Sequence, residues 1–152
     1  MNATSSRPLT TLLIGGLIVG VFDGTYAVVF SAFRGVSAAR LFQSVASGFF
    51  GRQSYNMGAT TVALGVVIHF FIATCVVLVY GAAAHNLAAL CTHPFLFGGT
   101  YGLFVYLFMN LVVIPLSAIT FRPKLPAIIS GIIVHIVLIG IPAALFARKA
   151  ER

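Results

Sequence analysis

The amino-acid sequence predicts an all-α integral membrane protein that forms a single membrane domain over residues 1–152. Four transmembrane helices are expected, with an amphipathic helix between the first and the second. Two observations predict this class. Of the 152 residues, 60% are hydrophobic and only 7% are charged, against about 45–50% and about 25% in soluble domains. The apolar residues also form four long runs, which a soluble fold of this size has no interior to bury. A soluble enzyme, a disordered tail and a nucleic-acid-binding protein are therefore excluded.

The four apolar runs have the length that a bilayer requires. A hydrocarbon core of about 30 Å takes about 20 helical residues at about 1.5 Å each. Only helices and closed barrels satisfy the backbone in lipid, and these runs lack the alternation of barrel strands. The first run is longer than the apolar part of a signal peptide, so we expect it to remain as a helix. The expected spans are residues 9–33, 58–84, 95–118 and 127–147.

The segment 34–56 is too polar to span a membrane and too apolar for a free loop. Ser37 is a suitable N-cap, and apolar side chains recur at four-residue spacing from Leu41 to Phe49. The pattern predicts an interfacial amphipathic helix, and a re-entrant segment over a central cavity is the alternative. Three arginines of this segment are placed to reach lipid headgroups: Arg34, Arg40 and Arg52.

The net charge of +7 comes from nine Lys and Arg residues and two acids. Almost all of the bases lie between the apolar runs, where membrane proteins meet lipid headgroups. A basic turn at 122–126 is one of these places. Four bases fall on the side of both termini and five on the opposite side, so the positive-inside rule is nearly balanced. We expect both termini in the cytoplasm, and dual topology in an antiparallel dimer is the alternative.

Each predicted span carries one strongly polar residue near its middle. Such groups are costly in lipid, about 2.5–3.5 kcal/mol for Asp, and are therefore candidates for function. Their depths agree within a slab of about 6 Å, and small residues on the same helix faces indicate that these faces meet other helices. The four residues, which we expect to converge on one site for a ligand or a proton, are Asp23, His69, Asn110 and His135. Tyr106 and Ser117 lie on the same face of the third span as Asn110 and are added to the site.

A histidine beside Asp23 would give the site a specific chemistry. A buried carboxylate without a partner takes up a proton at neutral pH. A carboxylate and an imidazole in contact instead titrate together, near physiological pH. Proton coupling is therefore physically available to this set of residues.

Glycines predict where the helices approach one another closely. Gly16, Gly20 and Gly24 form two overlapping GxxxG steps, and Gly98 and Gly102 form another. Small residues at this spacing let helix backbones come together in lipid. Because four helices enclose little space, we expect a homo-oligomer with one of these glycine stripes at its contact.

Two further patterns concern the spans that carry the polar residues. Residues 65–69 and 131–135 match in the positions of Gly and His, as a repeat of two hairpins would produce. Pro115 removes one helical hydrogen bond, which predicts a kink in the third span near Asn110.

Metal and enzyme chemistry have weak support in the sequence. His85, Cys91 and His93 lie in the loop between the second and third spans, but three ligands without a fourth make a poor metal site. No Ser–His or paired-Asp motif is present, and Ser117 has no base of its own. We expect no bound metal and no enzymatic activity.

Several segments resemble a family of small bacterial four-helix inner-membrane proteins: 34–37, 43–48, 65–70, 101–110 and 115–118. The second half is more distantly similar to YagU-type inner-membrane proteins, which also have a mid-span His, a Pro-Leu step and a final His-containing helix that ends in basic residues. The resemblance implies a multi-pass protein of the bacterial inner membrane. It carries no established activity.

These observations predict a small proton-linked transporter or channel that acts on a small ion or molecule and has the lipid bilayer as its surroundings. Two alternatives stay open. The first is a non-catalytic accessory protein whose polar residues only fix helix packing. The second is a b-type haem protein with His69 and His135 as axial ligands. Apart from that haem, no cofactor is expected.

Overall fold

The computed structural model describes residues 6–118 and 124–152. Within these residues every regular element is helical. Four helices are long and apolar enough to cross a membrane: Arg7–Ala32, Ala59–Asn86, Pro94–Leu116 and Leu125–Ala150. These bounds lie within three residues of the predicted spans, which confirms an all-helical chain with four such helices. Residues 122 and 123 of the predicted basic turn lie outside the described residues.

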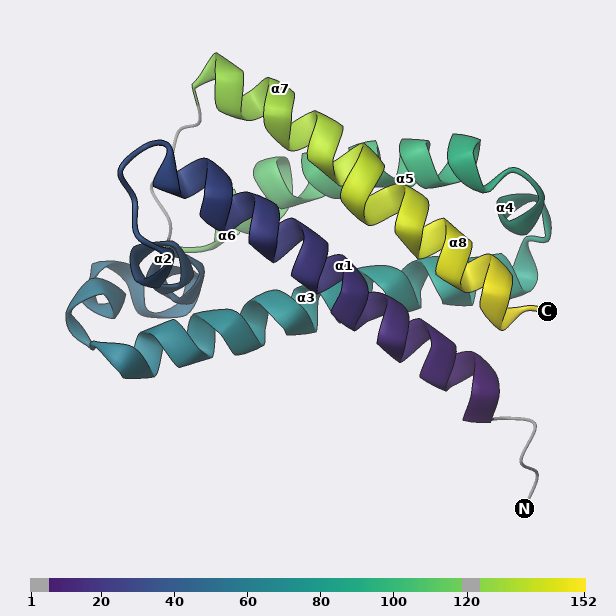
Figure 1. Ribbon diagram of the computed structural model, residues 1–152, viewed down its shortest axis with the longest axis horizontal. Coiled ribbons are helices and arrows are strands. Elements are labelled where there is room, and N and C mark those ends of the chain that lie inside the picture. The colour runs from purple at the N-terminus through teal and green to yellow at the C-terminus, as the bar shows by residue number, and fades with distance from the viewer. Residues whose placement is uncertain (1–5, 119–123) are drawn as a thin grey trace.

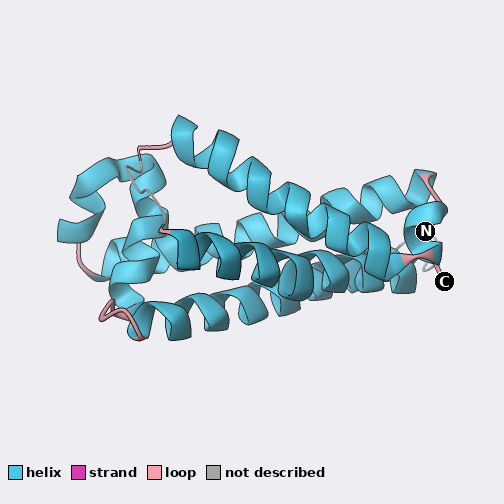
Figure 2. Cartoon of the chain, turned by 90° about the horizontal axis from the view of Figure 1, so that it is seen from above, coloured by secondary structure: helices cyan, strands magenta, loops and turns pink. Residues whose placement is uncertain are grey.

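The spanning helices run lengthwise, and the short elements lie at the two ends (Figures 1 and 2). The start of α1, the C-terminus and α4 lie at one end, here called the terminal end, and α2 lies at the other. The elements are α1 (Ser6–Ala32), α2 (Ala38–Phe50), η1 (Gly51–Asn56), α3 (Ala59–Asn86), α4 (Ala89–Thr92), α5 (Pro94–Phe108), η2 (Met109–Val113), α6 (Ile114–Leu116), α7 (Leu125–Val134), η3 (His135–Gly140) and α8 (Ile141–Ala150). The last span is thus α7, η3 and α8 in sequence.

The segment between the first two spans is helical, as predicted. The Ser37 hydroxyl accepts a hydrogen bond from the Arg40 N–H at 3.3 Å, which caps α2. Gly51 ends the helix with a φ of 56°, a conformation that favours glycine. α2 packs on α3, where the backbone of Phe42 would collide with any Cβ on Gly65. The interfacial location of this helix stays a prediction.

The tightest packing is found toward the terminal end of the bundle. There α1, α3 and α8 meet through small and β-branched side chains, which let the backbones approach closely. The buried cluster consists of Val19, Ala73, Val77, Tyr80, Ala84, Ile139, Ala143, Ala144 and Ala147. Only 17 to 28% of the most apolar part of each spanning helix is buried within the chain. The remaining apolar surface faces outward, as helices surrounded by lipid require.

The predicted glycine stripe of α1 lies against α3. A Cβ on Gly16 would lie 2.6 Å from the Cα of Thr74, and one on Gly20 would lie 2.6 Å from the ring of Phe70. Real Cβ atoms do not come this close to other carbon atoms, so both positions require glycine while the helices keep this spacing. The stripe is covered within the chain, and a contact between copies has to use other faces.

A second glycine contact joins α5 to η3. A Cβ on Gly98 would lie 2.8 Å from the carbonyl oxygen of Gly140, and one on Gly102 would collide with the backbone of His135. This stripe is also covered within the chain. Gly99, its neighbour on α5, has space, because an added Cβ would meet only a side-chain methyl of Ile136 at 3.6 Å.

The third and fourth spans each widen into a π-helical turn, directly before Pro115 and Pro142 respectively. In η2 the residue before Pro115 bonds to the carbonyl of Met109, and in η3 the residue before Pro142 bonds to the carbonyl of Ile136. Proline has no N–H to continue the α-helical ladder, and such single π turns are often found at functional sites. Near Asn110, where the sequence predicts a kink, the structure has a π turn.

Replacing Gly102 by Ala tests the close approach of α5 and η3. We expect the free energy of unfolding to fall by about 1–3 kcal/mol, because the added methyl group collides with the η3 backbone. Gly99→Ala is the matched control, since it adds the same methyl group to the same helix in open space and improves helix propensity. Thermal unfolding in a mild detergent measures both, and equal stability of the two variants would contradict this packing.

Candidate functional site

Two ionisable side chains meet inside the bundle where α1 packs on α3. Nδ1 of His69 lies 3.9 Å from Oδ2 of Asp23, and Nε2 of the same ring lies 2.9 Å from the carbonyl oxygen of Gly20. The side chains of His69 and Asp23 are 14% and 24% exposed, so both are largely shielded. The close packing of the helices sets this contact, because a Cβ on Gly24 would lie 3.0 Å from Nε2.

The hydrogen bond to Gly20 fixes which nitrogen of His69 carries a proton. A carbonyl oxygen only accepts, so Nε2–H is the donor and Nδ1 of the neutral ring is bare. A bare Nδ1 facing an ionised Asp23 would place two lone pairs opposite each other in a shielded position, which is unfavourable. A proton on either the Asp23 carboxyl group or Nδ1 would remove this repulsion.

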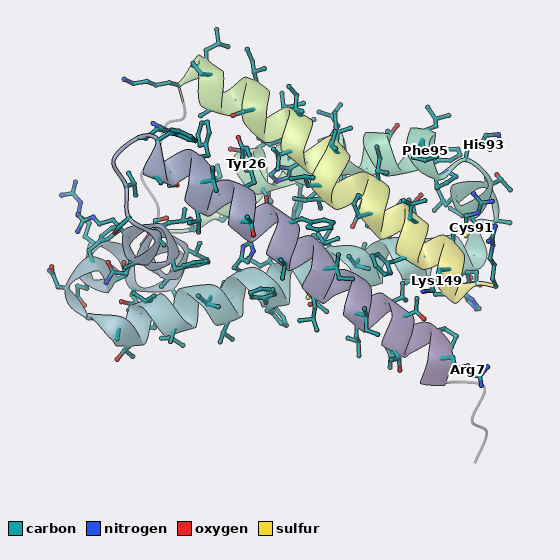
Figure 3. The ribbon with its side chains drawn as sticks, in the orientation of Figure 1. Arg7, Tyr26, Cys91, His93, Phe95 and Lys149 are labelled. Atoms are coloured by element: carbon teal, nitrogen blue, oxygen red, sulfur yellow. The ribbon has the colours of Figure 1, made fainter. Side chains whose placement is uncertain are left out.

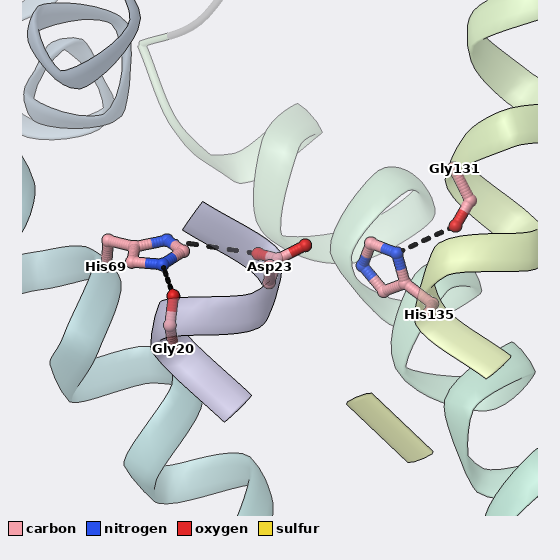
Figure 4. A network of polar contacts seen from close by, with 5 residues as sticks. All are labelled: Gly20, Asp23, His69, Gly131 and His135. Atoms are coloured by element: carbon pink, nitrogen blue, oxygen red, sulfur yellow. Dashed lines mark hydrogen bonds and ion pairs between the residues drawn. The ribbon is translucent and has the colours of Figure 1, made fainter. Parts of the chain in front are cut away.

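His135 lies on the other side of Asp23. Figure 4 shows the Asp23 side chain between the imidazole rings of His69 and His135. The Nδ1–H of His135 donates to the carbonyl oxygen of Gly131 in its own helix at 2.9 Å, which leaves Nε2 on the side of Asp23. In the described part of the chain, no hydrogen bond or ion pair joins Asp23 to His135.

Tyr106 belongs to the surroundings of His135. Its buried ring packs edge-on against the His135 imidazole with a centroid distance of 5.2 Å. The same ring occupies the space beside Gly131, where an added Cβ would lie 2.7 Å from Cε2 of Tyr106. Tyr106 therefore packs against both the His135 imidazole and the backbone at Gly131.

Asn110 and Ser117 bond to their own helix instead of to this cluster. Nδ2 of Asn110 donates to the carbonyl oxygen of Tyr106 at 2.9 Å, within the stretch that the π turn widens. The hydroxyl of Ser117 donates to the carbonyl oxygen of Ile114 at 2.7 Å. Ser117 also lines a groove of about 1400 Å³ between α2, α3 and the end of the third span, and Asp23, His69 and His135 do not.

Tyr26 is a polar residue near the cluster that sequence reasoning missed. It lies three residues after Asp23 on α1, so the two side chains are neighbours on the helix surface. Its hydroxyl oxygen is buried, and within the described residues it has no hydrogen-bond partner. A buried hydroxyl without a partner is costly and signals a functional or hydrated position. A tyrosine near the end of an apolar run is ordinary at a membrane interface. The sequence alone therefore does not distinguish Tyr26 as a candidate site residue.

The geometry does not fit the haem alternative. Two axial ligands have to face one iron from opposite sides of a flat porphyrin. Here α1 with Asp23 stands between the rings of His69 and His135 (Figure 4), and Nε2 of His69 is already bonded to Gly20. The matching segments 65–69 and 131–135 also differ in role, because His69 bonds to a neighbouring helix and His135 to its own.

The second polar set lies at the terminal end of the bundle, far from Asp23. Figure 3 shows Cys91 and His93 there, near Lys149. His85 pairs with Glu151 at 3.3 Å. Burial and the Glu151 carboxylate raise the pKa of the Cys91 thiol, and a nearby arginine of α8 opposes this shift. Among the described residues, no group of three His, Cys, Asp or Glu side chains is placed to hold a metal ion.

Comparisons with protein-family models, with curated proteins and with solved structures found no match to this chain. The resemblance to small bacterial inner-membrane proteins therefore stays a prediction. Function is inferred below from the contacts of the chain itself.

The two half-buried histidines, His69 and His135, are expected to adopt opposite neutral tautomers. His69 should carry its proton on Nε2 and His135 on Nδ1, because each of these nitrogens donates to a backbone carbonyl. Nitrogen-15 NMR of histidine-labelled protein in detergent distinguishes the two forms, and His69→Gln and His135→Gln assign the signals. The exposed His85 is an internal reference. Finding both half-buried rings in the same tautomer would contradict the contacts described above.

Proposed function

We propose that this chain is a small multi-pass protein of the bacterial inner membrane that moves protons, or a small ion or molecule coupled to protons, across the bilayer. One observation carries the proposal: Asp23 and His69 form a shielded pair whose contacts call for one shared proton. Ionisable groups held at membrane depth typically belong to proton relays or ion pathways. The bacterial location is proposed from the sequence resemblance.

The proposed transfer involves Oδ2 of Asp23 and Nδ1 of His69. Since Nε2 keeps its proton on the Gly20 carbonyl, only Nδ1 gains and loses one. The separation of 3.9 Å is longer than a hydrogen bond, so transfer needs a small movement or one bridging water. On the other side of Asp23, Nε2 of His135 is a basic nitrogen that can receive the proton next.

Three helical elements supply the groups of this route: Asp23 lies on α1, His69 on α3 and His135 on η3. Both stripes of glycine are covered within the chain. A homo-oligomer, which we also propose, would therefore meet through exposed apolar side chains such as Val67 and Leu111.

A non-catalytic accessory role is the second candidate, and a specific observation favours it. The side chains of Asn110 and His135 donate to carbonyls one turn earlier in their own helices, as polar residues do when they only satisfy themselves in lipid. On this account the Asp23–His69 contact is a packing bond between α1 and α3. It predicts loss of stability, and no change in flux, when either residue is replaced.

Proton flux into proteoliposomes separates the two candidates. A pH-sensitive dye trapped inside reports flux driven by a potassium diffusion potential. We expect flux through the wild-type protein above that of empty vesicles. Asp23→Asn and His69→Gln should each reduce it about tenfold or more, because each removes one of the two proton-carrying groups.

The matched control for this experiment is His85→Gln. It breaks the other contact between a histidine and a carboxylate, which lies in an exposed position at the terminal end, and it should leave the flux unchanged. Circular dichroism and the melting temperature of each variant report folding. Flux that survives Asp23→Asn would overturn the role of the acid. Absence of wild-type flux, together with destabilised variants, would favour the accessory role.

A further inference from the structure

The groove at the α2 end takes no part in the function proposed above. Its volume of about 1400 Å³ exceeds the roughly 300–1000 Å³ of pockets that enclose drug-sized ligands. One wall is α2 with η1, the second is α3, and the third is the end of the third span with η2 and α6. Apolar side chains from all three walls line its inner part: Leu41, Val45, Ile68, Ile72, Met109 and Val112.

The outer end of the groove is basic. Arg34, Arg40 and Arg52 line it, and none of them has an ion pair in the part of the chain that the structure describes. The guanidinium group of Arg40 lies over the ring of Tyr55 at 4.6 Å, which orients it without using its hydrogen-bond donors. The only two acids of the sequence, Asp23 and Glu151, are not among the lining residues.

The groove also has the length of an amphiphile within one leaflet. Along α3 it reaches Ile72, thirteen residues after the first residue of the helix, Ala59. At 1.5 Å per residue this is a depth of about 20 Å, more than half of a hydrocarbon core of about 30 Å. In a bilayer whose surface lies at the start of α3, the arginines would be at the level of the headgroups and the apolar walls at the level of the acyl chains.

From these features we propose that the groove binds an anionic phospholipid of the bilayer, with its phosphate on Arg34, Arg40 and Arg52 and an acyl chain along α3 and η2. Three arginines with no acid among the lining residues favour an anionic partner, and planar guanidinium groups suit phosphate oxygens. Basic pockets between membrane helices recognise anionic lipids in this way. The proposed site is separate from the Asp23–His69 pair and does not depend on it.

A second copy of the chain is a poorer occupant of this groove. Each copy carries a net charge of +7, so two copies would repel one another at a basic surface. Of the two acids that a copy could offer, Asp23 is shielded in its contact with His69. Glu151 is paired with His85 at the opposite end of the bundle. An anionic lipid supplies the negative charge that a second copy of the chain does not offer.

Lipid binding to delipidated protein in a neutral detergent tests this site. Phosphatidylglycerol and phosphatidylcholine with the same acyl chains are added separately, and bound lipid is counted by native mass spectrometry. We expect the wild-type protein to retain phosphatidylglycerol preferentially. Arg52→Gln should weaken that binding about fivefold, because one phosphate contact is lost at the membrane surface. Arg40→Gln should do the same, and high salt should reduce the preference.

Two further variants make the result specific to the groove. Arg148→Gln with Lys149→Gln removes two bases from the terminal end and should leave the preference intact. Val112→Trp fills the apolar wall and should reduce retention of both lipids. Circular dichroism verifies that each variant is folded. Equal retention of the two lipids by the wild-type protein would overturn the proposal. So would unchanged binding in folded Arg52→Gln and Arg40→Gln proteins, or a dimer that buries the groove and retains no lipid.

Discussion

The close approach of α1 and α3 at glycine positions is the contact on which both the fold and the candidate site depend. Without a Cβ at Gly20 and Gly24, the backbone of α1 comes near enough for His69 to reach a main-chain carbonyl of the neighbouring helix. That hydrogen bond occupies Nε2 and leaves Nδ1 on the side of Asp23. In lipid, where apolar surfaces give little driving force between helices, such close packing supplies much of the association. The contact between His69 and Asp23 thus depends on the positions where α1 has no side chains.

Small side chains also explain why the helices pack more closely at one end of the bundle than at the other. Alanine and glycine bring α1, α3, α5 and α8 close together toward the terminal end, and the helices separate toward the α2 end (Figure 2). There α2 packs on α3, and the groove lies between α2, α3 and the end of the third span. Each of the last two spans widens into a π turn before its proline. One of these turns begins at His135, so the backbone that places this ring is itself irregular.

Periodicity and composition predict the four spanning helices and the Ser37-capped helix between the first two, because these follow from length, hydropathy and local capping chemistry. They also place Asp23 and His69 at one depth. They do not determine where a side chain finds its partner. Asn110 bonds to a carbonyl in its own helix, a choice of rotamer within a π turn that a sequence pattern does not encode. The Tyr26 hydroxyl and the groove depend on how separate helices meet, which a sequence read helix by helix leaves undetermined.

The Asp23–His69 pair and the groove are connected through α2 and α3. His69 lies on α3 next to Ile68, which lines the groove, and the ring of Phe42 on α2 packs edge-on against the His69 imidazole at 6.1 Å. Leu41, its neighbour on α2, forms the groove wall. In the proposed lipid complex, the lipid would contact α2, the helix whose Phe42 ring packs against the His69 imidazole. The proposed lipid site and the proposed proton pair are therefore joined by one static contact between side chains.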